Sequence, residues 1–76
     1  MNDKIIKMTT YDVNGEKVHE TTEPLEVYKW IAEIMTYKHK GSKDVRRIEY
    51  NEQYDGHIHA TYYISNGVKI KTTIPR

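Results

Sequence analysis

Two histidines, His57 and His59, stand one residue apart in the segment DGHIHATYY and are the nearest thing to a chemical motif in the chain. On a strand, residues two apart point to the same side, where two imidazoles could hold a metal ion or act as a general base. Zinc sites take three or four protein ligands, and this pair supplies two. We therefore predict no metal site and expect both histidines on the solvated face of a strand.

Nucleophilic catalysis needs a serine, threonine, cysteine or lysine beside its base. The sequence has no cysteine, and Ser42 and Ser65 both stand in expected turns. The segment KGSK (40–43) has one glycine, which is too few for a phosphate-cradling loop. We predict no cofactor and no enzymatic activity.

Charge is unevenly spread along the chain and points to a second group of residues. Residues 38–47 carry five bases and one acid, whereas residues 12–33 carry six acids and two lysines. We predict that four cations and one aromatic ring meet in a basic corner, formed by Lys40, Lys43, Arg47, Tyr63 and Lys69. Such a corner can bind phosphate by charge and a base by stacking. The alternative is that Arg47 and Lys69 only solubilise the sheet, while the loop lysines complement a helix dipole.

The elements that position these residues form one domain, residues 1–76. Alternating patterns and turn signals predict strands at 4–12, 17–21, 45–53, 57–65 and 68–74. Between the second and third strands a helix begins after Thr22 or Glu23, with Pro24 in its first turn, and stops near Gly41. The order ββαβββ predicts an α+β fold with one helix on one face of a five-stranded, mainly antiparallel sheet. The place of the first hairpin relative to the last three strands stays open.

Loop length decides which side chains share a face of the sheet. A two-residue loop after the third strand would put the apolar residues of neighbouring strands on opposite faces. Three-residue bulged loops at 54–56 and 65–67, each with a left-handed glycine, pair Ile48 with Tyr62 and Tyr62 with Ile70. The other face then carries polar rows, the first of which is Arg47, Tyr63 and Lys69.

The expected helix is apolar over roughly twice the arc of a little over 100° that one sheet needs. Its predicted core stripe is Leu25, Val27, Tyr28, Ile31, Ala32, Ile34 and Met35. Trp30 and Tyr37 fall together at one margin. We predict an interface at Trp30, Tyr37 and Ile34, either between two copies of the chain or with another protein. The alternative is that Trp30 and Tyr37 cover a loop or the first hairpin of their own chain.

Composition bears on the source and compartment of the protein. Nine Ile, nine Lys and seven Tyr against two Ala and three Arg follow AT-rich codons, which indicates a low-GC bacterium or its phage. The N-terminal segment MNDKIIKMTT lacks the apolar run of a signal peptide or membrane span. Together with the missing cysteines, this predicts a cytoplasmic protein without membrane partners.

The function that these observations favour is binding. We predict a small non-enzymatic interaction domain that binds another protein, such as an inhibitor or accessory protein of a phage or mobile element, with self-association as a homodimer expected. The alternative is a binder of an anionic ligand, a nucleotide or single-stranded nucleic acid, at the basic corner.

Overall fold

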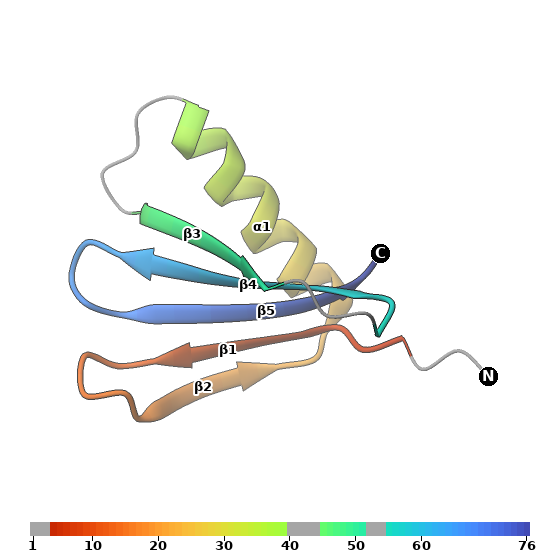
Figure 1. Cartoon of the computed structure of the whole chain (residues 1–76), viewed down its shortest axis with the longest axis horizontal. Coiled ribbons are helices and arrows are strands. Elements are labelled where there is room, and N and C mark those ends of the chain that lie inside the picture. The colour runs from red at the N-terminus through yellow and green to blue at the C-terminus, as the bar shows by residue number, and fades with distance from the viewer. Residues whose placement is uncertain (1–3, 40–44, 52–54) are drawn as a thin grey trace.

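The computed structural model describes residues 4–39, 45–51 and 55–76, with residues 35–39 described by their backbone alone. The elements are β1 (Lys7–Tyr11), β2 (Lys17–Thr21), α1 (Pro24–His39), β3 (Val45–Asn51), β4 (His57–Ile64) and β5 (Lys69–Pro75) (Figure 1). Within this part of the chain the predicted α+β fold, with a helix and a five-stranded antiparallel sheet, is confirmed. No helix among the described residues has the length and apolarity needed to cross a membrane.

The strand order of the sheet is β2-β1-β5-β4-β3, and every neighbouring pair is antiparallel. The last strand, β5, therefore lies at the centre and joins the first hairpin to the third and fourth strands (Figure 1). Helix α1 crosses one face of the sheet and leaves the other face open (Figure 1). The sequence left open where the first hairpin lies relative to the last three strands; in the structure β1 pairs with β5.

The predicted registers are confirmed where the strands pair. Ile48 of β3 lies opposite Tyr62 of β4, and Tyr62 lies opposite Ile70 of β5. Gly56 and Gly67 have φ angles of 80° and 93°, in the left-handed region that disfavours side chains. The bulged loops thus keep the apolar residues of three strands on one face.

The first hairpin turns around Asp12, whose side chain organises the tip. Its Oδ1 accepts hydrogen bonds from the backbone N–H groups of Asn14, at 2.9 Å, and Glu16, at 3.0 Å. Gly15 has a φ of 84°, and its N–H donates to the carbonyl oxygen of Asp12 at 2.9 Å. The Asn14-Gly15 signal therefore marks a turn, as predicted, and Asp12 stabilises it.

Helix α1 begins at Pro24 as predicted, and Glu23, one of the two predicted caps, stands at the N-cap: its carbonyl oxygen accepts the first helical hydrogen bond, from the N–H of Val27 at 3.1 Å. Thr21 Oγ1 accepts a hydrogen bond from the backbone N–H of Glu23 at 3.2 Å and donates one to Glu26 Oε2 at 2.7 Å. Thr21 is the last residue of β2, so these two bonds fix the short connection between β2 and the first turn of the helix.

A small core between α1 and the sheet is centred on Tyr62. Ile34, Ala60 and Tyr62 form its buried cluster, and Val27 is 0% exposed. The rings of Trp30 and Tyr62 meet edge to face with their centroids 4.8 Å apart. Burial, followed by the neighbouring Tyr50 hydroxyl, raises the pKa of Tyr62 above 10.0, while a hydrogen bond with Thr72 opposes the rise.

The predicted core stripe of the helix was wrong at Leu25 and Tyr28, which are 82% and 43% exposed, and at Ala32, which is also exposed. The side chain of Met35, the last residue of that stripe, lies outside the described part of the chain. The helix presents the line of Val27, Trp30 and Ile34 to the sheet. At 100° per residue, Leu25 lies about 160° and Tyr28 about 100° from Val27. Trp30 therefore belongs to the packed side of α1, and the exposed large apolar side chains among residues 24–34 lie near the start of the helix.

Candidate functional site

The sheet face opposite α1, here called the open face, carries the polar rows that the registers predict. Its first row crosses four strands in the order Tyr11, Lys69, Tyr63 and Arg47, each residue paired with the next. Side chains alternate along a strand, so the buried neighbour Tyr62 points to the helix while Tyr63 points away from it. The row therefore alternates aromatic and cationic side chains on an uncovered surface.

Tyr63 is flanked by two cations. The guanidinium carbon of Arg47 lies 4.2 Å from the centre of the Tyr63 ring, and Lys69 Nζ lies 5.8 Å from it. Both distances are within the range of cation–π attraction. Of the predicted basic corner, Arg47, Tyr63 and Lys69 come together, while Lys40 and Lys43 lie outside the described residues.

Beside this ring lies an open pocket of about 420 Å³, here called the Tyr63 pocket. It is lined by Arg46, Arg47, Tyr63, Ile64, Gly67, Val68 and Lys69. Simple alternation along β3 would turn Arg46 toward the helix face. The pairing register shifts between Val45 and Arg47, however, so Arg46 is the extra residue of a bulge and borders the pocket too. The sequence patterns missed this third cation.

One carboxylate, Glu49, stands in the neighbouring row and interacts with both partners of the stack. Its Oε2 lies 3.7 Å from Arg47 Nη2, and its Oε1 accepts a hydrogen bond from the Tyr63 hydroxyl at 3.4 Å. These contacts hold Arg47 and Tyr63 in place, but a carboxylate also repels an incoming anion. Glu49 therefore orients the basic corner and weakens its positive field.

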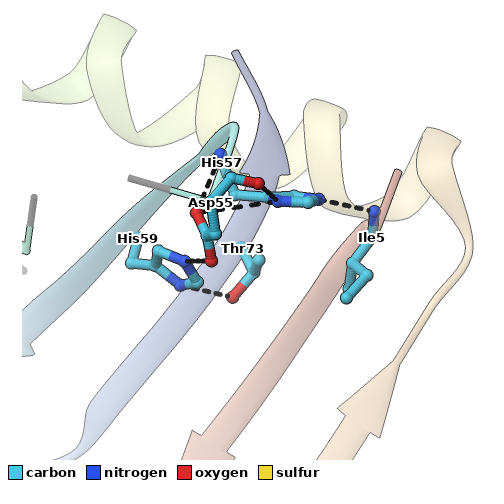
Figure 2. Close-up of polar contacts among 5 residues, drawn as sticks. All are labelled: Ile5, Asp55, His57, His59 and Thr73. Carbon is cyan, nitrogen blue, oxygen red and sulfur yellow. Dashed lines mark hydrogen bonds and ion pairs between the residues drawn. The ribbon is translucent and has the colours of Figure 1, made fainter. Parts of the chain in front are cut away.

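At the other end of β4, His57 is buried at 6% exposure, so the prediction that both histidines are solvated was wrong for this one. Its Nε2 accepts a hydrogen bond from the backbone N–H of Ile5 at 2.8 Å (Figure 2). Since an N–H group only donates, Nε2 carries no proton, and Nδ1 donates to the carbonyl oxygen of Asp55 at 3.0 Å. His57 is thus a neutral structural residue that holds the N-terminal segment.

His59 lies on the open face between Asp55 and Thr73 (Figure 2). Its Nε2 donates to Asp55 Oδ2 at 2.8 Å, and Nδ1 lies 3.2 Å from Thr73 Oγ1. The hydrogen bond from His59 lowers the pKa of Asp55 below 3.8; the backbone N–H of His57 lowers it further, and partial desolvation raises it. These two contacts link the segment before β4 to β4 itself and to the neighbouring strand β5.

The described residues contain no group of three His, Asp or Glu side chains placed to hold a metal ion, so His57 and His59 have no third ligand there. Asp55 contacts both rings, but it does so as a hydrogen-bond acceptor. The prediction of no metal site is tested below by chelation.

The predicted interface residues lie on the packed side of α1. Ile34 belongs to the buried cluster, and Trp30 is half-buried against Tyr62. The side chain of Tyr37 lies outside the described residues. Self-association through this group therefore stays a prediction. Among the described side chains of α1, the large apolar ones that are exposed are Leu25 and Tyr28.

Comparison of the chain with protein-family models, curated proteins and solved structures finds no match. A function for this chain is therefore inferred from the residues of its open face.

Proposed function

We propose that this domain binds an anionic ligand, a nucleotide or single-stranded nucleic acid, at the basic corner, without chemical conversion of that ligand. The observation that carries the proposal is the stack of Arg47 on Tyr63 beside a pocket of about 420 Å³ that Lys69 and Arg46 also line. A ring supplies a stacking surface for a base, and clustered cations supply the charge for its phosphate.

Arg47 covers one side of the Tyr63 ring, so a base must share or replace that contact. An exposed cation–π pair contributes about 0.5–1 kcal/mol, whereas stacking of a base on an aromatic side chain contributes about 1–3 kcal/mol. The side chain of Arg47 is 62% exposed and its ion pair with Glu49 is solvated, so moving the guanidinium off the ring breaks no buried contact. Replacement is therefore favourable, and the released guanidinium gains a bidentate contact with phosphate.

The test is binding of ATP and of a fluorescein-labelled 12-mer single strand, measured by calorimetry and anisotropy from 20 mM to 300 mM salt. Arg47→Ala and Lys69→Ala should weaken binding and flatten the salt dependence, by about 0.7 in slope for each lost phosphate contact. Tyr63→Ala should weaken binding about 5- to 150-fold with an unchanged slope, because stacking releases no counterions. Glu49→Gln should tighten binding, because it removes a repelling charge.

The matched control is Lys29→Ala, which removes one positive charge from an exposed position on α1. It should leave affinity and salt slope unchanged. Absence of binding at 20 mM salt, or a Lys29→Ala variant as weak as Arg47→Ala, would contradict the proposal.

A second candidate function is binding of another protein, favoured by exposed apolar side chains near the start of α1. Leu25 is 82% exposed, and an open pocket of about 360 Å³ nearby is lined by Lys4, Ile5, Ile6, Thr22 and Pro24. A protein partner would cover this surface at a gain that scales with the apolar area buried. The test is a lysate pulldown in which one partner is retained by the wild type and by Arg47→Ala but lost with Leu25→Asp.

A further inference from the structure

We propose that the open face binds at least two nucleotides of a single strand, with one base on Tyr63 and a second base on Tyr11. This inference rests on the proposed function and deepens it, because it replaces a free nucleotide with a polymer as the ligand. It starts from a second open pocket, of about 300 Å³, which Tyr11 and Lys71 line together with Tyr63 and Lys69. The two pockets share the last two side chains and so adjoin each other.

The two tyrosines are too far apart for a single base. Tyr11 is paired with Lys69, and Lys69 is paired with Tyr63, so two strand spacings separate the tyrosines. At about 4.8 Å per spacing, their backbones lie about 10 Å apart. A mononucleotide can stack on one ring only, whereas a strand with splayed bases can use both.

Each tyrosine has its own cation, with another cation between the rings. Arg47 lies over Tyr63, and Lys71 Nζ lies 5.4 Å from the centre of the Tyr11 ring. Lys69 stands between the two rings in the row. This arrangement alternates stacking positions with phosphate positions, as the repeating base and phosphate of a single strand require.

The charge available on the open face favours a polyanion. Among the described residues, Lys7 and Lys17 are ion-paired with Glu20, at 3.7 Å and 3.8 Å, whereas neither Lys69 nor Lys71 has a carboxylate within ion-pair distance. On the open face, the described lysines that lack such a carboxylate are thus those of the central strand, β5, between the two tyrosines. Asn51 lines the second pocket and offers an amide to the edge of a base, while Glu49 lines it too and lowers the positive field there, as it does at the basic corner.

The experiment compares ATP, a 12-mer of deoxythymidine and a 12-mer of uridine on the same variants. Tyr11→Ala should lower affinity for both 12-mers about 5- to 150-fold and leave ATP binding unchanged, whereas Tyr63→Ala should lower all three affinities. Lys71→Ala, at an exposed position, should flatten the salt slope for the 12-mers by about 0.7 and leave that for ATP unchanged. A difference between the two 12-mers would show whether the sugar hydroxyl is read.

Tyr28→Ala is the matched control, since it removes an exposed tyrosine from α1 on the other side of the molecule. It should not change any of the affinities. If ATP binds but the 12-mers bind no tighter, and both Tyr11→Ala and Lys71→Ala are neutral, this inference fails while the proposed function stands. If none of the three ligands binds, the proposed function fails as well.

Discussion

The backbone N–H of Ile5 donates a hydrogen bond to Nε2 of His57, at 2.8 Å, across 52 positions of sequence. This bond ties the segment before β1 to the start of β4, two strands away in the sheet. Because Nδ1 of the same ring donates to the carbonyl oxygen of Asp55, both ring nitrogens of His57 are satisfied. His57, half of the motif that suggested chemistry, therefore has a structural role: it holds the segment before β1 against β4.

Substitution of His57 by alanine should lower the free energy of unfolding by about 1–3 kcal/mol, because it removes a buried ring and leaves two partners without their hydrogen bond. The measurement is urea unfolding at pH 7.5, with amide exchange of Ile5 followed by NMR. His59→Ala, which removes a more exposed ring, should cost less and leave exchange at Ile5 slow. Equal losses in the two variants would contradict the assigned role of His57.

Asp55 should contribute stability that disappears in acid. Its pKa is lowered below 3.8 in the folded protein, first by the hydrogen bond from His59, so folding favours the carboxylate form. A lowered folded pKa gives stability that is present above the ordinary pKa and lost as pH falls through the lowered value. The difference in stability between the wild type and Asp55→Asn should thus be constant near neutral pH and shrink below pH 3.8.

Urea unfolding from pH 7 down to acid measures this difference. In a His59→Ala background the acid-dependent part should be smaller, because the largest cause of the shift is gone. An unchanged acid dependence in that background would assign the effect to another group.

The turns of the first and last hairpins touch through Val13 and Gly67. A Cβ at Gly67 would lie 3.1 Å from Val13 Cγ1, whereas a Cβ at Gly56 would meet nothing within 4 Å. Both glycines have positive φ, so alanine at either position should lower the free energy of unfolding by roughly 1–2 kcal/mol. Gly67→Ala should lower it by about 0.5–1.5 kcal/mol more, because the new methyl group displaces the Val13 side chain.

Thermal and urea unfolding of the two variants check this ranking. In a Val13→Ala background the extra cost at Gly67 should disappear, while the cost at Gly56 should not change. Equal costs at both glycines in the wild-type background would show that the two turns do not press on each other.

Removal of metal ions should leave stability unchanged. The described residues hold no cluster of three His, Asp or Glu side chains placed for an ion, and both rings of the His-x-His pair are engaged by hydrogen bonds. The melting temperature should therefore be the same with and without EDTA. A fall of several degrees that zinc restores, and that is absent in His59→Ala, would contradict this prediction.

Self-association is best tested at the exposed start of α1, since Ile34 and Trp30 pack within their own chain. We expect light scattering to give a mass that rises above 9.0 kDa as concentration increases through the micromolar range. Leu25→Glu should restore the monomer, because it puts a charge on an apolar contact. A constant mass of 9.0 kDa in the wild type would leave Leu25 and Tyr28 for a different partner.

The part of the fold that followed from the sequence is the part governed by local rules. The pairing of Tyr62 with Ile48 and Ile70 came from requiring bulged glycine loops to bring apolar residues to one face. The same registers brought Arg47, Tyr63 and Lys69 together. They also placed His59 beside Thr73, so that contact was within reach of the sequence patterns.

The remainder depends on contacts between distant segments. Burial of His57 needs Ile5, and no periodicity links the two. Arg46 reaches the Tyr63 pocket only because β3 contains a bulge, which the alternating pattern does not mark. The helical pattern indicated a wide apolar arc but not which part of it contacts the sheet. Packing against the sheet places Trp30 on the inner side of α1 and Leu25 on the outer side.

The central place of β5 has a consequence for how the chain comes to be folded. During synthesis the hairpin of β1 and β2 and the hairpin of β3 and β4 leave the ribosome before the strand that joins them. Until residue 75 has emerged, β1 and β4 each present a bare edge that can pair with a neighbouring nascent chain. We therefore expect the sheet to close only after translation has passed β5, in one late step slowed by long-range pairing.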